Sequence, residues 1–138
     1  MVLKTKVTYT YRFPYRNLPG HTGQFPVVPV MLSASRSVDA PGVIDTGSQR
    51  TIFDGGYAST IGLRLEDGTS IPIQPFGNGT FFTKALRCHI FFNGQDMELD
   101  VCFSEIKIPR NILGRDFLDR VQMGLREHHE LVFLRPEP

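Results

Sequence analysis

Val43-Ile44-Asp45-Thr46-Gly47-Ser48 is the stretch of the chain that says most about its fold. The aliphatic pair at its start predicts the end of a short buried strand, and Thr51–Phe53 predicts a strand that leaves the polar segment. A carboxylate, two hydroxyls and a glycine stand between the two strands. Asp45 is therefore the first candidate for a residue that carries chemistry.

A second informative element is Ile112-Leu113-Gly114-Arg115-Asp116-Phe117-Leu118, an apolar pair, a glycine and the opening of a helix. With this element and the Asp45-Thr46-Gly47-Ser48 motif, the chain resembles the retropepsin-like aspartic proteases over roughly residues 25–134. The resemblance implies an all-β, retropepsin-like closed barrel or β-sandwich subunit with a flap hairpin and one short C-terminal helix. It also implies that the two segments cross beneath the active site, where Gly114 allows close packing.

The resemblance further implies that Asp45, Thr46 and Gly47 are catalytic, in an aspartic endopeptidase that cleaves peptides or proteins without a cofactor. Hydrolysis by this route needs one carboxylate to accept a proton from water and a second, protonated carboxyl to donate to the scissile carbonyl. The 138 residues hold a single such motif, so a homodimer with its two-fold axis through the site is expected. Thr46 would hydrogen-bond across that axis, and Ser48 would donate to the Asp45 carboxylate.

Gly77-Asn78-Gly79 separates the two apolar stretches Ser70–Phe76 and Thr80–Phe92. These three residues tolerate the positive φ angles of a tight turn, so a β-hairpin is expected. The resemblance places a mobile flap over the substrate at this position, which makes Gly77, Asn78 and Gly79, together with Ser48, candidates for substrate binding. An ordinary solvent-exposed turn is the alternative.

One feature departs from the resemblance. Retroviral enzymes commonly carry an acidic residue two places after the glycine of the motif, whereas this chain has Gln49 followed by Arg50. In the family that acidic group pairs with the arginine that corresponds to Arg115. A structural or dimer role for Gly114 and Arg115 therefore requires another carboxylate, from Asp116, Asp54 or the second subunit.

Thirteen glycines and ten prolines divide the chain into short pieces rich in β-branched and aromatic residues, which predicts an all-β fold. The further elements expected are strands at Lys6–Phe13, Phe25–Leu32, Met97–Phe103 and Leu131–Leu134, a polar turn region at Ser33–Gly42, a hairpin turn at Asn93-Gly94, a short helix at Tyr57–Leu63 closed by Gly62, and a helix at Arg115–Gln122 stopped by Gly124. Pro26 and Pro29 cannot donate to a ladder, so their strand should lie at an edge or turn both nitrogens to solvent.

The length fits a single domain. Residues 1–24 are expected to form an N-terminal extension or strand, and residues 25–138 the retropepsin-like aspartic protease domain. The resemblance implies that Leu131–Leu134 joins the two subunits, because the terminal strands of retropepsins interleave. A core strand within one subunit is the alternative.

Composition and charge limit the classes of partner expected for this chain. A net charge of +1, with basic and acidic residues interspersed, argues against a nucleic acid or an anionic membrane as partner. Without a signal peptide or a long apolar run, a cytoplasmic location is expected. Cys88 and Cys102 suggest buried free thiols, and the pair His128-His129 has no Cys or further His nearby, so no metal site is expected.

Other functions receive less support from the sequence. The main alternative is a catalytically silent retropepsin-like module that dimerises and binds peptides, although the intact Asp-Thr-Gly-Ser motif argues against it. A serine or cysteine hydrolase would lack a Gly-x-Ser-x-Gly elbow, and His89 should point to the opposite strand face from Cys88. A phosphate-binding role would need a glycine-rich loop of the Walker type, which the sequence does not contain.

Overall fold

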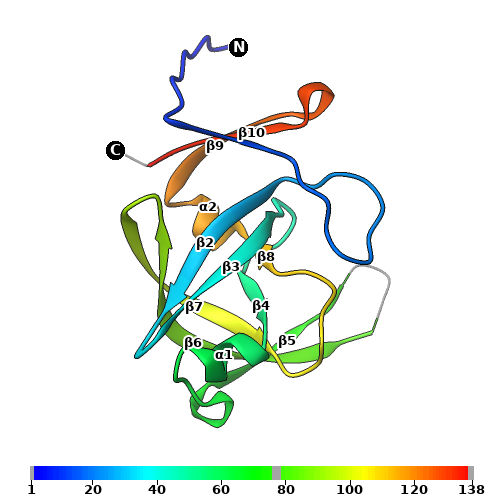
Figure 1. Ribbon diagram of the computed structural model, residues 1–138, viewed down its shortest axis with the longest axis vertical. Coiled ribbons are helices and arrows are strands. Elements are labelled where there is room, and N and C mark those ends of the chain that lie inside the picture. Colours follow the sequence, from blue (N-terminus) through cyan, green and yellow to red (C-terminus); the bar gives the residue numbers. More distant parts are fainter. Residues whose placement is uncertain (1, 76–78, 137–138) are drawn as a thin grey trace.

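The computed structural model describes residues 2–75 and 79–136, and it is built mainly of β-strands (Figure 1). The strands are β1 (Tyr11–Pro14), β2 (Val27–Ser33), β3 (Ser37–Ile44), β4 (Ile52–Asp54), β5 (Thr69–Ile73), β6 (Phe81–Phe92), β7 (Gln95–Ser104), β8 (Ile112–Leu113), β9 (Val121–Arg126) and β10 (Leu131–Pro136). Two short helices, α1 (Gly56–Thr60) and α2 (Arg115–Leu118), and two 3-10 turns, η1 (Leu65–Asp67) and η2 (Glu127–His129), connect them. The all-β expectation is confirmed.

The larger sheet closes on itself. Its strands run in the order β2-β3-β8-β4-β7-β6-β5, and β2 also pairs with β6 through Met31–Ser33. A closed barrel results, and side chains from all around it fill one apolar core, with Phe53, Phe103 and Ile90 fully buried. Strand β5 lies outside the closure and extends the sheet as a hairpin with β6.

The one proline of β2, Pro29, is accommodated by its register, and Pro26 precedes the strand. Pro29 lies opposite Pro41 of β3, and because neither residue can donate, this must be a non-hydrogen-bonded pair of the antiparallel ladder. The other side of β2 meets β6 only from Met31 onward. The strand is therefore an edge in its first half, as expected, and part of the barrel closure in its second half.

Both predicted hairpins form. In the β6–β7 hairpin, Asn93 and Gly94 adopt φ angles of 48° and 81°, which is the pattern of a type I′ turn. In the β5–β6 hairpin, Ile73 lies opposite Phe81. The predicted tip residues Gly77 and Asn78 lie outside the described residues.

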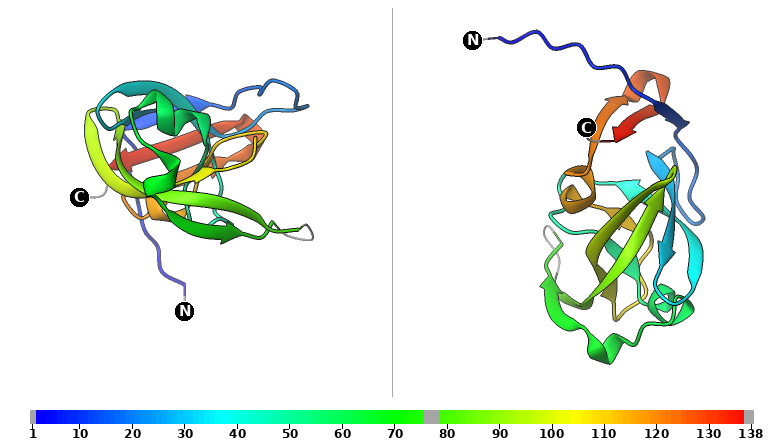
Figure 2. Two further views of the ribbon diagram at one scale, coloured as in Figure 1. Left: turned by 90° about the horizontal axis from the view of Figure 1, so that it is seen from below. Right: turned by 90° about the vertical axis from the view of Figure 1, so that its left-hand side faces the viewer.

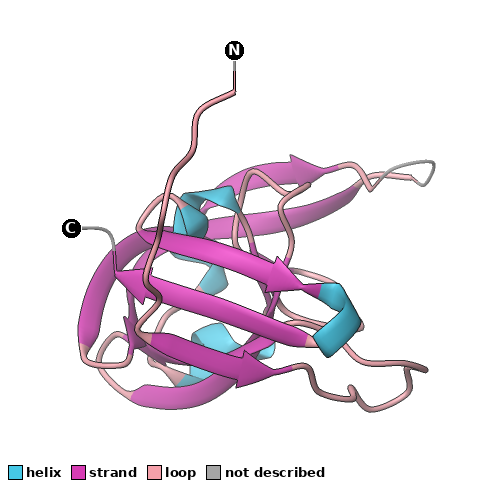
Figure 3. Cartoon of the chain, turned by 90° about the horizontal axis from the view of Figure 1, so that it is seen from above, coloured by secondary structure: helices cyan, strands magenta, loops and turns pink. Residues whose placement is uncertain are grey.

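The second sheet consists of β1, β10 and β9 in that order, and it packs against one end of the barrel (Figures 2 and 3). Phe92 is the centre of the contact, since its ring lies 5.8 Å from Tyr11, 5.7 Å from Phe13 and 6.2 Å from Phe117. Aromatic pairs at such distances add to the stabilisation from burial. The N-terminal strand is thereby tied to the rest of the fold.

Two expectations about local structure are wrong. The turn expected over Ser33–Gly42 is confined to residues 34–36, because β3 begins at Ser37 and pairs with β2 along seven residues. Its polar side chains alternate with the half-buried Val38 and the buried Ala40, so strand pairing overrides a turn-like composition. Likewise the strand expected from Lys6 begins only at Tyr11, where β10 provides a partner.

The C-terminal helix is shorter than expected. It ends at Leu118, and the predicted helical residue Val121 opens β9 instead. Gly124 is not a helix stop but lies within β9, opposite Phe133 and close to the ring of Tyr9. A short apolar run does not distinguish helix from strand by periodicity alone, and here pairing with β10 decides.

Strand β10 lies between β9 and β1 of the same chain, so both of its edges are already paired. The expectation that Leu131–Leu134 interleaves with a second subunit is therefore wrong, and the alternative of a core strand holds. Val132 and Leu134 are fully buried. Within the described residues, no helix is long and apolar enough to cross a membrane.

Candidate active site

Asp45 stands at the end of β3, where the chain turns into the loop of residues 45–51. Its backbone nitrogen donates to the carbonyl of Leu113 (3.0 Å), which ties the loop to β8. Its Oδ1 accepts a hydrogen bond from the backbone nitrogen of Gly47 (2.9 Å). The half-buried carboxylate is thus held over its own loop, with part of its surface open.

The loop is supported from below by β8. This strand runs parallel to β3, with Val43 opposite Ile112, and antiparallel to β4, with Ile52 opposite the same residue. The short β8 therefore lies between the strand that enters the loop and the strand that leaves it. Two segments about seventy residues apart in sequence form one compact base.

Gly114 makes the close approach possible. A Cβ at this position would lie 2.8 Å from the carbonyl oxygen of Ser48 and 2.6 Å from the carbonyl carbon of Arg50. Contacts of this length do not occur for real side chains, so the site requires glycine. The adjacent nitrogen of Arg115 donates to the Ser48 carbonyl (2.8 Å), which continues the contact into α2.

The loop ends at Thr51, which is fully buried and bound to Asp116. Oδ2 of Asp116 accepts from the Thr51 nitrogen (3.1 Å), and Oδ1 accepts from the Thr51 hydroxyl (2.7 Å) and from the Phe117 nitrogen (2.8 Å). The Thr51 hydroxyl also accepts from the Gly114 nitrogen (3.2 Å). The sequence analysis gave Thr51 no role in this contact. The signal that could have indicated it is Asp116, because an acidic residue in the first turn of a helix is known to bind backbone N–H groups.

Comparison with solved structures matches this arrangement to one fold. A retropepsin-like aspartic protease from Rickettsia conorii superposes with a TM-score of 0.66 at 15% identity, covering 94% of this chain and 96% of that one. The retroviral protease-like domain of Ddi1 from Leishmania major gives a TM-score of 0.58 at 19% identity, covering 83% and 94%. EIAV protease in complex with the inhibitor HBY-793 gives 0.52 at 21%, covering 69% and 86%.

The chain has a retropepsin-like fold. At the level of sequence, no protein-family model and no curated protein matches it. The likeness in structure therefore establishes the fold alone.

The hydrogen bond expected from the Ser48 hydroxyl to the Asp45 carboxylate does not form. Its hydroxyl donates instead to the carbonyl of Arg50 (2.7 Å). The backbone turn at residues 45–48, in which the Ser48 nitrogen donates to the Asp45 carbonyl (3.2 Å), turns the side chain toward the far end of the loop. Ser48 thus stabilises the loop rather than the charge on Asp45.

Neither intrachain carboxylate suggested for Arg115 pairs with it. Asp116 is bound to Thr51, and Asp54 accepts from the nitrogens of Gly56 (3.0 Å) and Ile108 (3.3 Å). Within residues 2–75 and 79–136, no carboxylate lies within 4 Å of the Arg115 guanidinium. Of the three expected partners, only a carboxylate of a second subunit is left.

Thr46 and Gly47 occupy the exposed top of the loop. The side chain of Thr46 has no hydrogen-bond partner among the described residues, although every residue from 48 to 51 is bonded to β8, α2 or its own loop. Thr46 therefore projects a free hydroxyl from a rigid base.

The β5–β6 hairpin extends beyond the barrel, toward the right in Figure 1. The hydroxyl of Thr83 donates to the carbonyl of Ile71 (2.9 Å), which fastens the base of the hairpin, and Phe82 exposes half of its surface. Gly79 is exposed, and a Cβ there would meet nothing within 4 Å. The position of the hairpin is compatible with the expected flap, whose tip is not described.

Neither Cys88 nor Cys102 is placed to act as a catalytic nucleophile. Both cysteines are free and buried, as predicted. Burial and, next, the charge of Asp100 raise the pKa of the Cys88 thiol to about 12, and burial also raises the pKa of Cys102. His89 lies on the other face of β6, where its ring bonds Asp96 (2.8 Å), so it does not reach Cys88.

Proposed function

We propose that the chain is an aspartic endopeptidase that is active as a homodimer, with Asp45 of each copy forming the catalytic pair. The observation that carries the proposal is the setting of Asp45. Its carboxylate is half-open at the top of a loop that β8, Gly114 and Asp116 support from below. Two other carboxylates, Asp54 and Asp116, accept hydrogen bonds through both of their oxygens, whereas only Oδ1 of Asp45 is bonded among the described residues.

The mechanism requires two such carboxyl groups. When two are brought within a few Å of each other they share one proton, because both cannot be ionised readily. The ionised Asp45 takes a proton from water, whose oxygen attacks the peptide carbonyl carbon, while the protonated Asp45 donates to the carbonyl oxygen. When the tetrahedral intermediate collapses, the C–N bond breaks and the carboxyl group that took the proton of water gives it to the leaving nitrogen. The other carboxylate recovers a proton from a hydroxyl of the intermediate, which restores the starting state.

The second copy is proposed to meet the first at the top of the loop. The free hydroxyl of Thr46 would bond its counterpart across the two-fold axis, and the Arg115 guanidinium would pair with a carboxylate of the other copy. Since β10 is already paired on both sides, a sheet contact between subunits would use the outer edges of β1 or β9, which have no strand partner among the described residues.

Peptide and protein chains are the proposed substrates. Gly47 would leave the backbone open to an extended peptide, and the β5–β6 hairpin, with Gly77, Asn78 and Gly79 at its tip, would close over it. Ser48 is proposed to act on substrate only indirectly, through the shape of the loop. A cytoplasmic location remains a prediction from sequence.

The test compares wild type with Asp45→Asn at high protein concentration. An unfolded protein is incubated with each from pH 4 to pH 7, products are detected by mass spectrometry, and the oligomeric state is measured by sedimentation. Products from the wild type alone support the proposal. A dimer that yields no products from either protein would instead favour the silent peptide-binding module.

A further inference from the structure

Positive charge is concentrated in the first part of the chain. No acidic residue precedes Asp39, whereas five cations do: Lys4, Lys6, Arg12, Arg16 and Arg36. The net charge of +1 therefore averages a basic N-terminal part with a remainder that has more acids than bases. The fold decides where these cations stand on the surface.

The small sheet of β1, β10 and β9 has one face toward the barrel and one face toward solvent. Val132, in the middle strand, is fully buried, so its neighbour Phe133 faces outward. The register places Arg12 of β1 opposite Phe133. It places Arg126 of β9 opposite Leu131, on the same outward face. Both arginines are exposed, so the outward face carries a cation on each of its outer strands.

The N-terminal arm, residues 2–10, passes over this outward face (Figure 3). The ring of Tyr9 lies 5.7 Å from the ring of Phe133. The guanidinium of Arg135 donates to the carbonyl of Thr8 (3.4 Å). These contacts fix the arm to the sheet from Thr8 onward.

Upstream of these contacts the arm stands out from the sheet (Figure 2). Every residue from 2 to 8 is exposed, including Lys4 and Lys6. Val2 and Leu3 expose 90% and 77% of their surface. The tip of the arm thus offers apolar and cationic side chains together.

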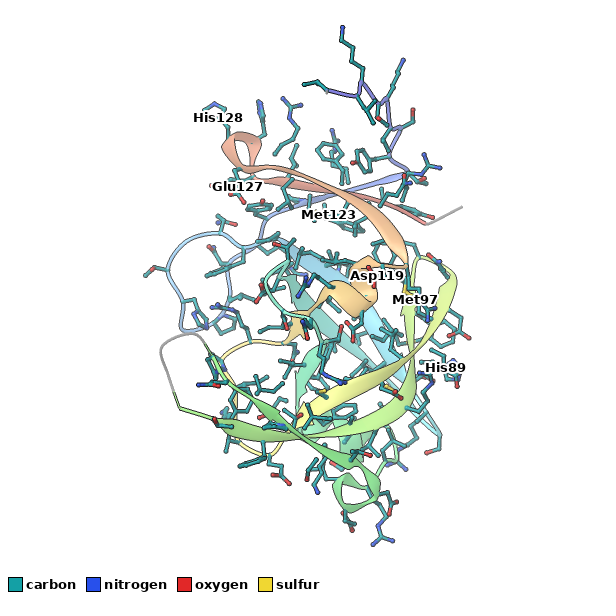
Figure 4. The ribbon with its side chains drawn as sticks, turned by 180° about the vertical axis from the view of Figure 1, so that it is seen from behind. His89, Met97, Asp119, Met123, Glu127 and His128 are labelled. Atoms are coloured by element: carbon teal, nitrogen blue, oxygen red, sulfur yellow. The ribbon has the colours of Figure 1, made fainter. Side chains whose placement is uncertain are left out.

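Four cations of the arm and of the outward face form what we call the basic end: Lys4, Lys6, Arg12 and Arg126. Among residues 2–75 and 79–136, no carboxylate lies within 4 Å of any of them. The acids that follow β9, Glu127 and Glu130, lie in the turn before β10. Glu127 (Figure 4) is turned toward the barrel, because it accepts from the hydroxyl of the buried Tyr15 (2.8 Å). The positive charge of the basic end is therefore open to an external anion.

We propose that the basic end binds the surface of an anionic phospholipid bilayer. The lysines and arginines meet the negative headgroups, and Val2 and Leu3 enter the layer between the headgroups and the acyl chains. Each cation near such a surface strengthens binding about fivefold. This binding goes beyond the proposed peptidase activity and does not depend on it. It departs from the expectation drawn from net charge, because the charge is unevenly distributed over the chain.

The side chains of the arm favour a bilayer over a nucleic acid as the partner. Single-stranded nucleic acids stack their bases on exposed aromatic rings, whereas the rings of Tyr9 and Phe133 lie against each other. Exposed aliphatic side chains at the tip of the arm suit a headgroup layer. The outward face is also separate from the outer edges of β1 and β9, so a bound bilayer leaves both edges free for a second copy.

Binding is measured by co-sedimentation of the full chain with two kinds of vesicle. One is phosphatidylcholine alone, and the other contains about 30% phosphatidylserine as the anionic lipid. The chain should bind the anionic vesicles at least about tenfold more tightly, and the difference should shrink as salt is raised. Equal binding to the two vesicles, or binding to neither, overturns the inference. So does tighter binding to a DNA oligonucleotide than to the anionic vesicles.

Substitutions identify the surface responsible. Lys4→Gln, Lys6→Gln and Arg12→Gln should each weaken binding to the anionic vesicles about three- to fivefold. Lys107→Gln is the matched control, because it removes the same charge from an exposed residue in the loop between β7 and β8. It should change binding by less than about twofold. An equal loss from Lys107→Gln and Lys6→Gln would show attraction by net charge alone and overturn the inference.

Insertion of the arm is followed by fluorescence. The chain contains no tryptophan, so Leu3→Trp introduces a single probe at the tip of the arm. Its emission should shift to shorter wavelength with anionic vesicles and stay unchanged with phosphatidylcholine alone. Ile106→Trp, at a residue of the barrel that is 54% exposed, is the control and should not shift with either. An unshifted Leu3→Trp, or an equal shift of Ile106→Trp, overturns the inference.

Discussion

The carboxylate of Asp116 binds both hydrogen-bond donors of Thr51, accepting from its nitrogen over 3.1 Å and from its hydroxyl over 2.7 Å. The two residues are 65 positions apart, and their contact closes the loop that begins at Asp45. Because Thr51 is fully buried, no water can replace a lost partner.

Asp116→Ala is therefore expected to lower the free energy of unfolding by about 2–3 kcal/mol, with a similar loss for Thr51→Val. In a double-mutant cycle followed by urea denaturation, the combined loss should be clearly smaller than the sum. Asp119→Ala, at the exposed residue that follows α2 (Figure 4), is the control and should change stability by less than about 0.5 kcal/mol. Strict additivity of the two changes would contradict the contact.

Gly114→Ala should displace the active-site loop, because the new methyl group would collide with the backbone of Ser48 and Arg50. We expect a loss of about 2 kcal/mol in unfolding free energy and a large fall in any peptidase activity. Gly79→Ala, where a Cβ meets nothing within 4 Å, provides the stability control. Equal melting temperatures for the two variants would show that the loop accommodates a side chain.

Ser48→Ala removes a hydrogen bond to the Arg50 carbonyl and none to Asp45. We therefore expect a loss of about 1 kcal/mol in stability, while the acid limb of the pH–activity profile stays in place. The profile is measured on purified protein with a fluorogenic peptide. An acid limb displaced to higher pH would mean that Ser48 stabilises the charged form of Asp45 after all.

Thr46→Val should weaken the proposed dimer without unfolding the subunit, because the hydroxyl has no partner among the described residues and the side chain is exposed. A tenfold higher dissociation constant is expected by sedimentation over a dilution series, which corresponds to about 1.4 kcal/mol. Thr46→Ser, which keeps the hydroxyl, should dimerise like wild type. Unchanged association of Thr46→Val would remove Thr46 from the interface.

The buried thiols predict a stability change at alkaline pH. The unfolded Cys88 thiol ionises near pH 9, whereas burial and Asp100 raise the pKa of the folded thiol to about 12. The stabilisation is therefore complete below pH 9 and is lost as the pH rises toward 12, at up to about 1.4 kcal/mol per pH unit. Urea unfolding at pH 8 and pH 10 should show a steeper loss for wild type than for Cys88→Ala, and a parallel loss in the two proteins would contradict it.

A control on the folded thiols uses Ellman's reagent. At pH 8 neither Cys88 nor Cys102 should react until urea is added, because both side chains are buried and the reactive thiolate is disfavoured. Burial and then the hydrogen bond to Glu127 also raise the pKa of Tyr15 to about 12. Its contribution to the pH dependence of unfolding is the same in wild type and in Cys88→Ala, so it does not affect their comparison.

Much of the local structure could be predicted because the signals lie within a few residues. Asn93-Gly94 specifies its type I′ turn by backbone conformation alone, and Gly62, with a φ of 90°, follows the short helix α1 as expected. The helix expected over Arg115–Gln122 was too long because its second half carries a strand pattern that only β10 reveals. The turn expected over Ser33–Gly42 is shorter than expected for the same reason, with β2 as the partner of the strand that begins at Ser37.

The sequence by itself determined that Asp45 would stand in a polar loop between two buried strands and that Gly114 would open a short helix, because apolar pattern and glycine chemistry act locally. Tertiary structure alone decided that β2 would meet β6 to close the barrel, that β10 would lie between β9 and β1, and that Asp116 would bind Thr51 rather than Arg115. These contacts join residues far apart in the chain, and a carboxylate binds whichever buried donors the packing brings to it.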